Sequence, residues 1–332
     1  MTTLSQRLLP LEPQYRERVW GGRRLKECEP PVGEAWVAFE ESRVRAGAHA
    51  GSTLAELSER HGAGLLGREV AAEYGARFPL LVKLLDCADW LSVQVHPDDE
   101  QAERLLGPGQ PGKTEGWYFI EAEDGATIYA GVRPGTTRED LEGAIRGGRV
   151  LEVTQRHEVR AGETVYIPAG TLHALGPGLL LYEVQQSSDT TFRVYDWGRP
   201  ASAGRKLHVE ESAAVADPSS VVAVRAPLAL GGTACGTVLR CKFFELEVVC
   251  VGDEPFACDT EGRSFQVFTV TEGAAELSCG EESVRLGLYE TALVAGDAGA
   301  YRVAAREGGA KMLRATVPPR EPDAQPGRSR PR

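Results

Sequence analysis

The stretch AGETVYIPAGTLHAL, residues 161–175, carries a glycine, a Pro-x-Gly turn and one histidine, His173. Its first part, ETVYIPA, is rich in β-branched and aromatic residues, which favour a strand. Glycine and proline shape tight turns, because glycine reaches positive φ values and proline has a fixed φ. The stretch therefore predicts a turn between two strands, with a histidine at a fixed offset beyond it.

Similar short runs, bounded by Gly, Pro or Asp, recur along the chain and predict further strands. They are EAWVAFEE (34–41), FPLLVKLLD (78–86), WLSVQVH (90–96), GWYFIEA (116–122), ATIYAGV (126–132), LLLYEVQQ (179–186), KFFELEVVCV (242–251), SFQVFTVTEG (264–273) and LYETALVAGD (288–297). Their weak polar/apolar alternation indicates that several are buried on both faces. Many short strands at turn spacing predict a mainly β fold, either a sandwich or a barrel.

Helical patterns interrupt the strands near residues 52–75 and 136–148. The run STLAELSERHG (52–62) offers Ser52 or Thr53 as N-cap, with Leu54 and Leu57 on one face. The run TTREDLEGAIRGG (136–148) has a capping residue, early acids and a glycine stop. Both are expected to be insertions between strands.

Composition excludes several classes of function. The 332 residues carry a net charge of −11, which repels phosphate backbones and makes nucleic acid an improbable partner. There is no apolar run near 18 residues and no secretory h-region, so we expect no membrane contact and a cytoplasmic protein. Seven cysteines without a C-x-x-C pair indicate reduced thiols rather than disulfides or a thiolate metal cage.

Three segments concentrate side chains that bind metals. LSVQVHPDD (91–99) supplies Gln94 and His96, which on a strand share a face with Cα atoms about 7 Å apart. GKTEGWY (112–118) supplies Glu115, and the opening stretch supplies His173. Two imidazoles, a carboxylate and an amide oxygen suit zinc or a similar divalent ion with an open position. Taken singly, His96 also fits a plain strand-end histidine and Glu115 a solvated carboxylate.

The pattern Gly162-x5-Pro168-x-Gly170-x2-His173 resembles the second cupin motif, except that Pro177 stands where the motif has asparagine. The first cupin motif is stretched here, since Gln94-x-His96 replaces a pair of histidines. Six ordered blocks are similar to type I mannose-6-phosphate isomerases, especially their short bacterial form. They are RVWGGRRL (18–25), FPLLVKLLD (78–86), LSVQVHPDD (91–99), GKTEGWY (112–118), YIPAGTLHAL (166–175) and QQSSDTTFRVYDWGR (185–199).

The resemblance implies cupin barrels, of the double-stranded β-helix or jelly-roll type, with small helical insertions. It also implies one Zn2+ per chain, held by Gln94, His96, Glu115 and His173, and an active-site arginine at Arg193. The implied reaction interconverts mannose 6-phosphate and fructose 6-phosphate through an enediol. Two alternatives stay open, a metal cupin oxygenase, which would favour a three-histidine iron site, and a non-catalytic sugar-binding cupin module.

Four further side chains are candidates for the reaction. Arg193 offers a fixed positive charge, although without the resemblance a salt bridge to Asp189 or Asp196 would be the preferred explanation. Lys113, with Lys83, is expected to recognise the phosphate or to transfer a proton, the latter if its pKa is lowered. Lys83 either snorkels outward or points into a polar cavity. Ser92 has the strand parity of Gln94 and would bind phosphate, or is an ordinary strand serine.

The domain organisation follows from the same blocks. Residues 1–210 are expected to form the catalytic, metal-binding domain, 211–230 a linker, and 231–318 a second, metal-free cupin-like β domain. Residues 319–332, rich in Pro, Arg and Gly, are expected to be a disordered tail. The expected partner is a small sugar phosphate, and the expected assembly is a monomer or weak homo-oligomer. Residues 36–42 differ from the family pattern, so we expect them to alter the pocket lining.

Overall fold

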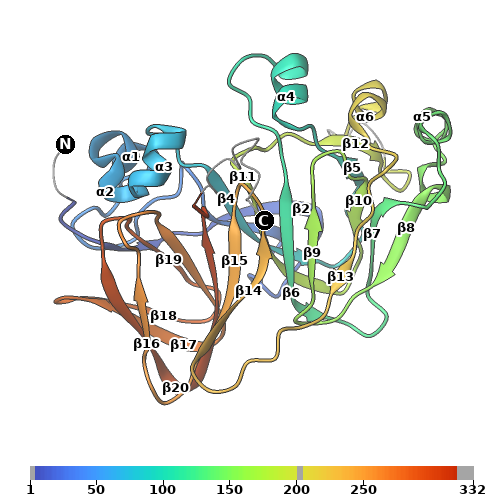
Figure 1. The fold of residues 1–332 in the computed structure, drawn as a ribbon. Coiled ribbons are helices and arrows are strands. Elements are labelled where there is room, and N and C mark those ends of the chain that lie inside the picture. The colour runs from blue at the N-terminus through green and yellow to red at the C-terminus, as the bar shows by residue number, and fades with distance from the viewer. Residues whose placement is uncertain (1–3, 200–204, 320–332) are drawn as a thin grey trace, which may run out of the picture.

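The computed structural model describes residues 4–199 and 205–319, and these are mainly β, as predicted (Figure 1). The strands of the first half are β1 (Leu8–Leu11), β2 (Gln14–Gly22), β3 (Val32–Ala38), β4 (Leu80–Cys87), β5 (Val93–Val95), β6 (Glu115–Ala122), β7 (Thr127–Val132), β8 (Thr154–Glu158), β9 (Thr164–Ile167), β10 (His173–Leu175), β11 (Leu179–Gln186) and β12 (Phe192–Tyr195). Those that follow are β13 (Val224–Arg225), β14 (Ala234–Arg240), β15 (Glu245–Val251), β16 (Phe256–Asp259), β17 (Gln266–Cys279), β18 (Glu282–Leu286), β19 (Thr291–Val294) and β20 (Ala300–Thr316).

Three antiparallel sheets build the molecule. A seven-stranded sheet has the order β13-β9-β6-β11-β4-β2-β3, and a five-stranded sheet has the order β12-β5-β10-β7-β8. The third sheet contains β1 and the strands from β14 onward, with β17 and β20 at its centre. In Figure 1 this third sheet stands apart from the other two, beneath the helices α1–α3.

The central strands β4 and β11 of the seven-stranded sheet are buried on both faces, which explains why they are almost continuously apolar. On β4, Leu84 packs into a core shared with the third sheet and α1–α3. The next residue, Leu85, packs into the core between the seven- and five-stranded sheets. On β11, Tyr182 and Leu181 divide between the same two cores. The second of these cores holds the strands that carry the candidate ligands.

The helices are short, and two of them are capped as the sequence predicts. They are α1 (Leu54–His61), α2 (Ala63–Leu66), α3 (Arg68–Tyr74), α4 (Asp99–Leu106), α5 (Arg138–Arg146) and α6 (Val209–Val215), with a 3-10 turn at Val150–Glu152. Thr53 caps α1 and Thr137 caps α5, each in a capping box. No helix among the described residues is long and apolar enough to cross a membrane.

Two segments depart from the expected domain outline. Residues 211–230 were predicted to be a linker, but they contain the end of α6 and β13, which pairs with β9 and extends the seven-stranded sheet. At the other end of the chain, β1 pairs with β19 of the third sheet, from Leu8 opposite Val294 to Leu11 opposite Thr291. Of the predicted disordered tail, only Pro319 is described, and residues 320–332 lie outside the described residues.

Candidate metal centre and cavity

Three neighbouring strands of the five-stranded sheet place the candidate side chains in register. Gln94 on β5 lies directly opposite His173 on β10 and, on its other side, opposite Arg193 on β12. Directly opposed residues of antiparallel strands project to the same face of the sheet. The pairing therefore brings side chains from three distant segments to one face.

The turn before His173 has the conformation that its glycine predicts. Gly170 has a φ of +83°, which side-chain-bearing residues rarely adopt. Its N–H donates to the carbonyl of His96 over 2.8 Å. The turn is thus fastened to the end of β5, and the two histidines are brought together.

His96, Glu115 and His173 form one buried cluster. The Nε2 atom of His96 lies 3.3 Å from Glu115 Oε1, and Nε2 of His173 lies 3.4 Å from Glu115 Oε2. Potential ligand atoms of all three residues lie within 4.8 Å of one another, and each residue is at most 1% exposed. The solvated alternative for Glu115 is therefore wrong.

The ring nitrogens are arranged as metal ligands require. His173 Nδ1 lies 2.8 Å from the carbonyl of Thr171, so Nδ1 carries the proton and Nε2 presents its lone pair to the cluster. Within the described part of the chain, Nε2 of His173 and both ring nitrogens of His96 lack hydrogen-bond partners. Buried polar atoms are rarely left without partners, and a divalent cation would satisfy them.

Charges around the cluster keep its members in the ligand-competent form. Burial, with Lys113 nearby, lowers the pKa of His96 to about 3. Burial also lowers the pKa of His173. For Glu115, burial alone would raise the pKa, but Lys113 and the two histidines outweigh it and bring the value well below normal. Two neutral imidazoles and one carboxylate therefore face each other, which matches the preferences of zinc and similar ions.

A cavity of about 480 Å³ opens beside this cluster. Its lining comes from the strands β2 to β5, β11 and β12 and from the loops that precede β6 and α6. The lining residues are Glu17, Arg18, Val19, Trp20, Glu34, Lys83, Leu85, Leu91, Ser92, Gln94, Lys113, Glu183, Asp189, Thr191, Arg193, Arg205 and His208. The four predicted substrate-binding residues and Gln94 all belong to it, whereas His96, Glu115 and His173 lie behind the wall.

Lys113 and Arg193 reach the cavity in different ways. Lys113 Nζ lies 2.8 Å from Glu115 Oε1, so this ammonium joins the cavity to the ligand cluster. Arg193 donates from Nε to Ser92 Oγ over 3.3 Å and from Nη1 to the Lys206 carbonyl over 3.1 Å. No ion pair of Arg193 is found in the ranges that the structure covers, so the predicted alternative of a salt bridge is wrong.

Lys83 corrects one expectation. Its side chain is buried rather than snorkelling, and Nζ donates to Glu183 at 3.0 Å and to Gln185 at 2.8 Å. Burial alone would lower its pKa, but Glu183 and Glu34 outweigh burial and raise it. A lysine with a raised pKa remains an ammonium and does not act as a base. The prediction of a lowered pKa is therefore wrong for Lys83.

Sequence reasoning missed several residues of the cavity wall. Arg205 is one, and its guanidinium is paired with Asp196. His208 accepts the backbone N–H of Arg193 at Nδ1 over 3.2 Å, which leaves Nε2–H as the donor on the opposite side of the ring. Glu34 lines the wall where residues 36–42 were expected, and it accepts two hydrogen bonds from Arg18. None of these three residues belongs to a matching block, so no motif in the sequence marks them.

Comparison with known proteins gives a consistent result. A family model described as the phosphomannose isomerase type I catalytic domain matches residues 8–112. Mannose-6-phosphate isomerase of Bacillus subtilis is 41% identical over 223 residues, 63% of this chain and 68% of that protein. Mannose-6-phosphate isomerase of Streptococcus mutans is 41% identical over 214 residues, 61% of this chain and 65% of that protein.

Solved structures extend the likeness over the whole fold. The crystal structure of the Bacillus subtilis mannose 6-phosphate isomerase has a TM-score of 0.81 at 29% identity, covering 93% of this chain and 99% of that chain. A phosphomannose isomerase from Salmonella typhimurium has a TM-score of 0.77 at 17% identity, a likeness of fold alone. The sequence matches and the fold agree, and the chain belongs to the mannose-6-phosphate isomerase family.

Proposed function

We propose that this chain is a zinc-dependent aldose–ketose isomerase that interconverts mannose 6-phosphate and fructose 6-phosphate. The observation that supports it most strongly is the buried cluster of His96, Glu115 and His173, with unpartnered ring nitrogens, beside a cavity lined by cations. Membership of the mannose-6-phosphate isomerase family supports the choice of substrate. We assign catalysis to a cupin-type domain over residues 1–210, and a metal-free structural role to residues 231–318.

Gln94 is proposed as the fourth ligand, with His96, Glu115 and His173. Its place opposite His173 on the neighbouring strand, and in the cavity wall, supports this role. When bound, one zinc ion would supply fixed positive charge beside the cavity without redox chemistry. The carboxylate of Glu115 reduces the net charge of such a site, and the oxygen of Gln94 is the ligand nearest to substrate.

The proposed reaction moves one proton from C2 to C1 through an enediol, while the O2 hydroxyl proton passes to O1. The carbonyl then lies at C2 instead of C1, so atoms and electrons balance without a co-reactant. Lys113 is proposed to handle protons at the substrate oxygens, because it lines the cavity and its ammonium lies 2.8 Å from Glu115.

Arg193 is proposed to stabilise developing negative charge, because its guanidinium lines the cavity without a carboxylate partner among the residues described. Ser92 accepts from Arg193 and still has a hydroxyl proton to donate to a phosphate oxygen. Lys83 contributes positive charge to the wall through its pairing with Glu183. We further propose that the protein acts in the cytoplasm on this small sugar phosphate, as a monomer or weak homo-oligomer.

The test is fructose 6-phosphate formation from mannose 6-phosphate, with glucose 6-phosphate in parallel. Activity should fall to background after EDTA treatment and return when zinc is added back. A zinc-loaded protein that binds sugar phosphates without turnover would instead support the binding module. Bound iron together with oxygen uptake would support the oxygenase, since two histidines and one carboxylate also suit non-haem iron.

A further inference from the structure

We propose that Gln186 and Asp99 are positioning residues that hold the segment 112–114, and so set the places of Lys113 and Glu115. This inference rests on the proposed function for its catalytic consequence, but it also predicts zinc affinity, which is measured independently. Gln186 ends β11, and Asp99 is the first residue of α4. The two residues come from distant segments and meet behind the metal cluster.

The segment 112–114 has no strand or helix of its own, and outside groups fix its backbone. Its three consecutive N–H groups each donate to a different acceptor. Gly112 donates to Asp99 Oδ1 over 2.9 Å, Lys113 to the Pro97 carbonyl over 2.9 Å, and Thr114 to Gln186 Oε1 over 3.0 Å. Two of the three acceptors are side chains, so substitution can remove them without changing the backbone.

Gln186 and Asp99 are also bonded to each other, which makes them one unit. Gln186 Nε2 donates to Asp99 Oδ1 over 2.9 Å, the same oxygen that accepts from Gly112. The backbone N–H of Gln186 donates to the Thr114 carbonyl over 3.2 Å. Gln186 is only 7% exposed, so water would poorly replace its side-chain oxygen as the acceptor for the Thr114 N–H.

The Gln186–Asp99 pair is also connected, through Thr114, to the segment that carries His173. Thr114 Oγ1 accepts from the N–H of Ala169, in the turn that precedes His173. A shift of Thr114 would therefore disturb Glu115 directly and the His173 turn through one hydrogen bond. Gly112 makes the close approach possible, because a Cβ there would lie 2.5 Å from backbone atoms of Asp98 and Asp99.

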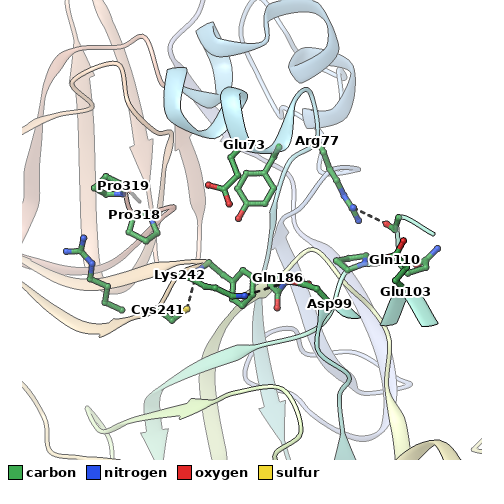
Figure 2. Close-up of a pocket in the computed structure, with 15 residues that line it drawn as sticks. Glu73, Arg77, Asp99, Glu103, Gln110, Gln186, Cys241, Lys242, Pro318 and Pro319 are labelled. Carbon is green, nitrogen blue, oxygen red and sulfur yellow. Dashed lines mark hydrogen bonds and ion pairs between the residues drawn. The ribbon is translucent and has the colours of Figure 1, made fainter. Parts of the chain in front are cut away.

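Gln186 and Asp99 act from outside the reacting cavity. They line a second cavity of about 1040 Å³ between α3, α4 and the loop around Cys241. Figure 2 shows them side by side, with Lys242 approaching from that loop. Lys242 Nζ lies 4.0 Å from Asp99 Oδ2, but it is exposed and contributes little. In the described structure neither residue lines the 480 Å³ cavity, so their effect on the reaction must be one of position.

The test compares Gln186→Leu with the wild type in kinetics and in zinc affinity, the latter measured by chelator competition with zinc alone. Gln186→Leu removes both side-chain hydrogen bonds at similar volume. We expect about a 10- to 100-fold loss in kcat and in zinc affinity, the range found for residues that support metal ligands, with a smaller change in KM. Wild-type zinc affinity and a kcat within about 2-fold would overturn the proposal.

Two further variants keep the test decisive if Gln186→Leu folds poorly. In Gln186→Glu the new carboxylate still accepts from Thr114 but repels Asp99 while it is ionised. Its zinc affinity relative to wild type should recover as the pH falls and the new carboxyl becomes able to donate to Asp99. A pH-independent ratio would contradict the role of the Gln186–Asp99 bond.

Gln101→Ala is the matched control, because it removes the side-chain half of the capping box of α4, the bond from the Asp98 N–H to Gln101 Oε1, without touching the segment 112–114. It should keep wild-type zinc affinity, and a loss as large as that of Gln186→Leu would show that α4 stability alone is responsible. If the wild type proves inactive on mannose 6-phosphate, the proposed function fails. A loss of zinc affinity in Gln186→Leu would still support the positioning role.

Discussion

Two regions of the molecule bury a charged cluster, and they treat it in opposite ways. In the third sheet, Arg314 on β20 donates from Nε to Glu247 on β15 over 2.7 Å. Its terminal nitrogens contact the sulfur atoms of Cys235 and Cys258 at 3.6 Å, and the Phe268 ring stacks near the guanidinium. In the metal-ligand cluster, by contrast, both ring nitrogens of His96 and Nε2 of His173 lack hydrogen-bond partners among the described residues.

The difference separates a structural cluster from a site. Around Arg314, donors and acceptors satisfy one another and nothing further is needed. Around His96, deeper burial leaves lone pairs open to a cation or a proton, and the lowered pKa values of both histidines disfavour the proton. A buried cluster whose polar atoms lack partners is therefore a stronger indication of function than burial or charge alone.

The largest effect is expected from His173→Ala, which breaks the functional side of the comparison. Removing one imidazole should abolish zinc binding and reduce isomerase activity to background, because the cluster loses one of its two nitrogen ligands. Zinc content and turnover measure this, and circular dichroism should report a folded chain. Normal zinc content with full activity would refute the ligand assignment.

Arg314→Met should have the second largest effect, and it should change stability alone. It leaves the carboxylate of Glu247 largely buried and unpaired, which costs about 3 kcal/mol of unfolding free energy. Urea unfolding measures the loss, and zinc affinity should stay at the wild-type value. A parallel loss of zinc affinity would mean that the two clusters are coupled and that the contrast between them is mistaken.

Glu34→Gln should have the smallest effect, and it should sharpen the comparison through the pH dependence of stability. Burial alone would raise the pKa of Glu34, but Lys83 and Arg18 outweigh it and lower the pKa below 4.5. The stabilisation is then present above about pH 4.5 and lost as the pH falls through the folded-state pKa. The variant should therefore flatten this acid limb, which urea unfolding across pH measures. An unchanged limb would exclude Glu34 as its source.

Much of the fold could be predicted because local patterns agree with the final structure. The strands and the caps at Thr53 and Thr137 follow from residue type and spacing. The helix α4 was not predicted, although Asp98 and Gln101 form a capping box, because Asp98 also belongs to the block 91–99, which was interpreted as a metal-binding segment. The pairing of β13 with β9 depends on contact between distant segments, which a single sequence does not display.

The candidate site likewise has a part that the sequence predicts and a part that it does not. The spacing around Gly170 predicts the turn at His173, and the matching blocks identify the candidate ligands. The partners of Lys83 come from β11, where Glu183 lies opposite Lys83 in the antiparallel register. That register is set by tertiary packing, so the raised pKa of Lys83 could not be read from LLVKLLD alone. His208 and Arg205 likewise line the cavity only because the chain folds back toward it after β12.

The pairing of β1 with β19 orders events during synthesis. Leu8 to Leu11 leave the ribosome long before their partners Thr291 to Val294. Gln94, His96, Glu115 and His173 all emerge between these two moments. The nascent chain thus acquires all four proposed ligands before β1 can pair with β19. Metal capture is therefore able to precede the closing of the third sheet.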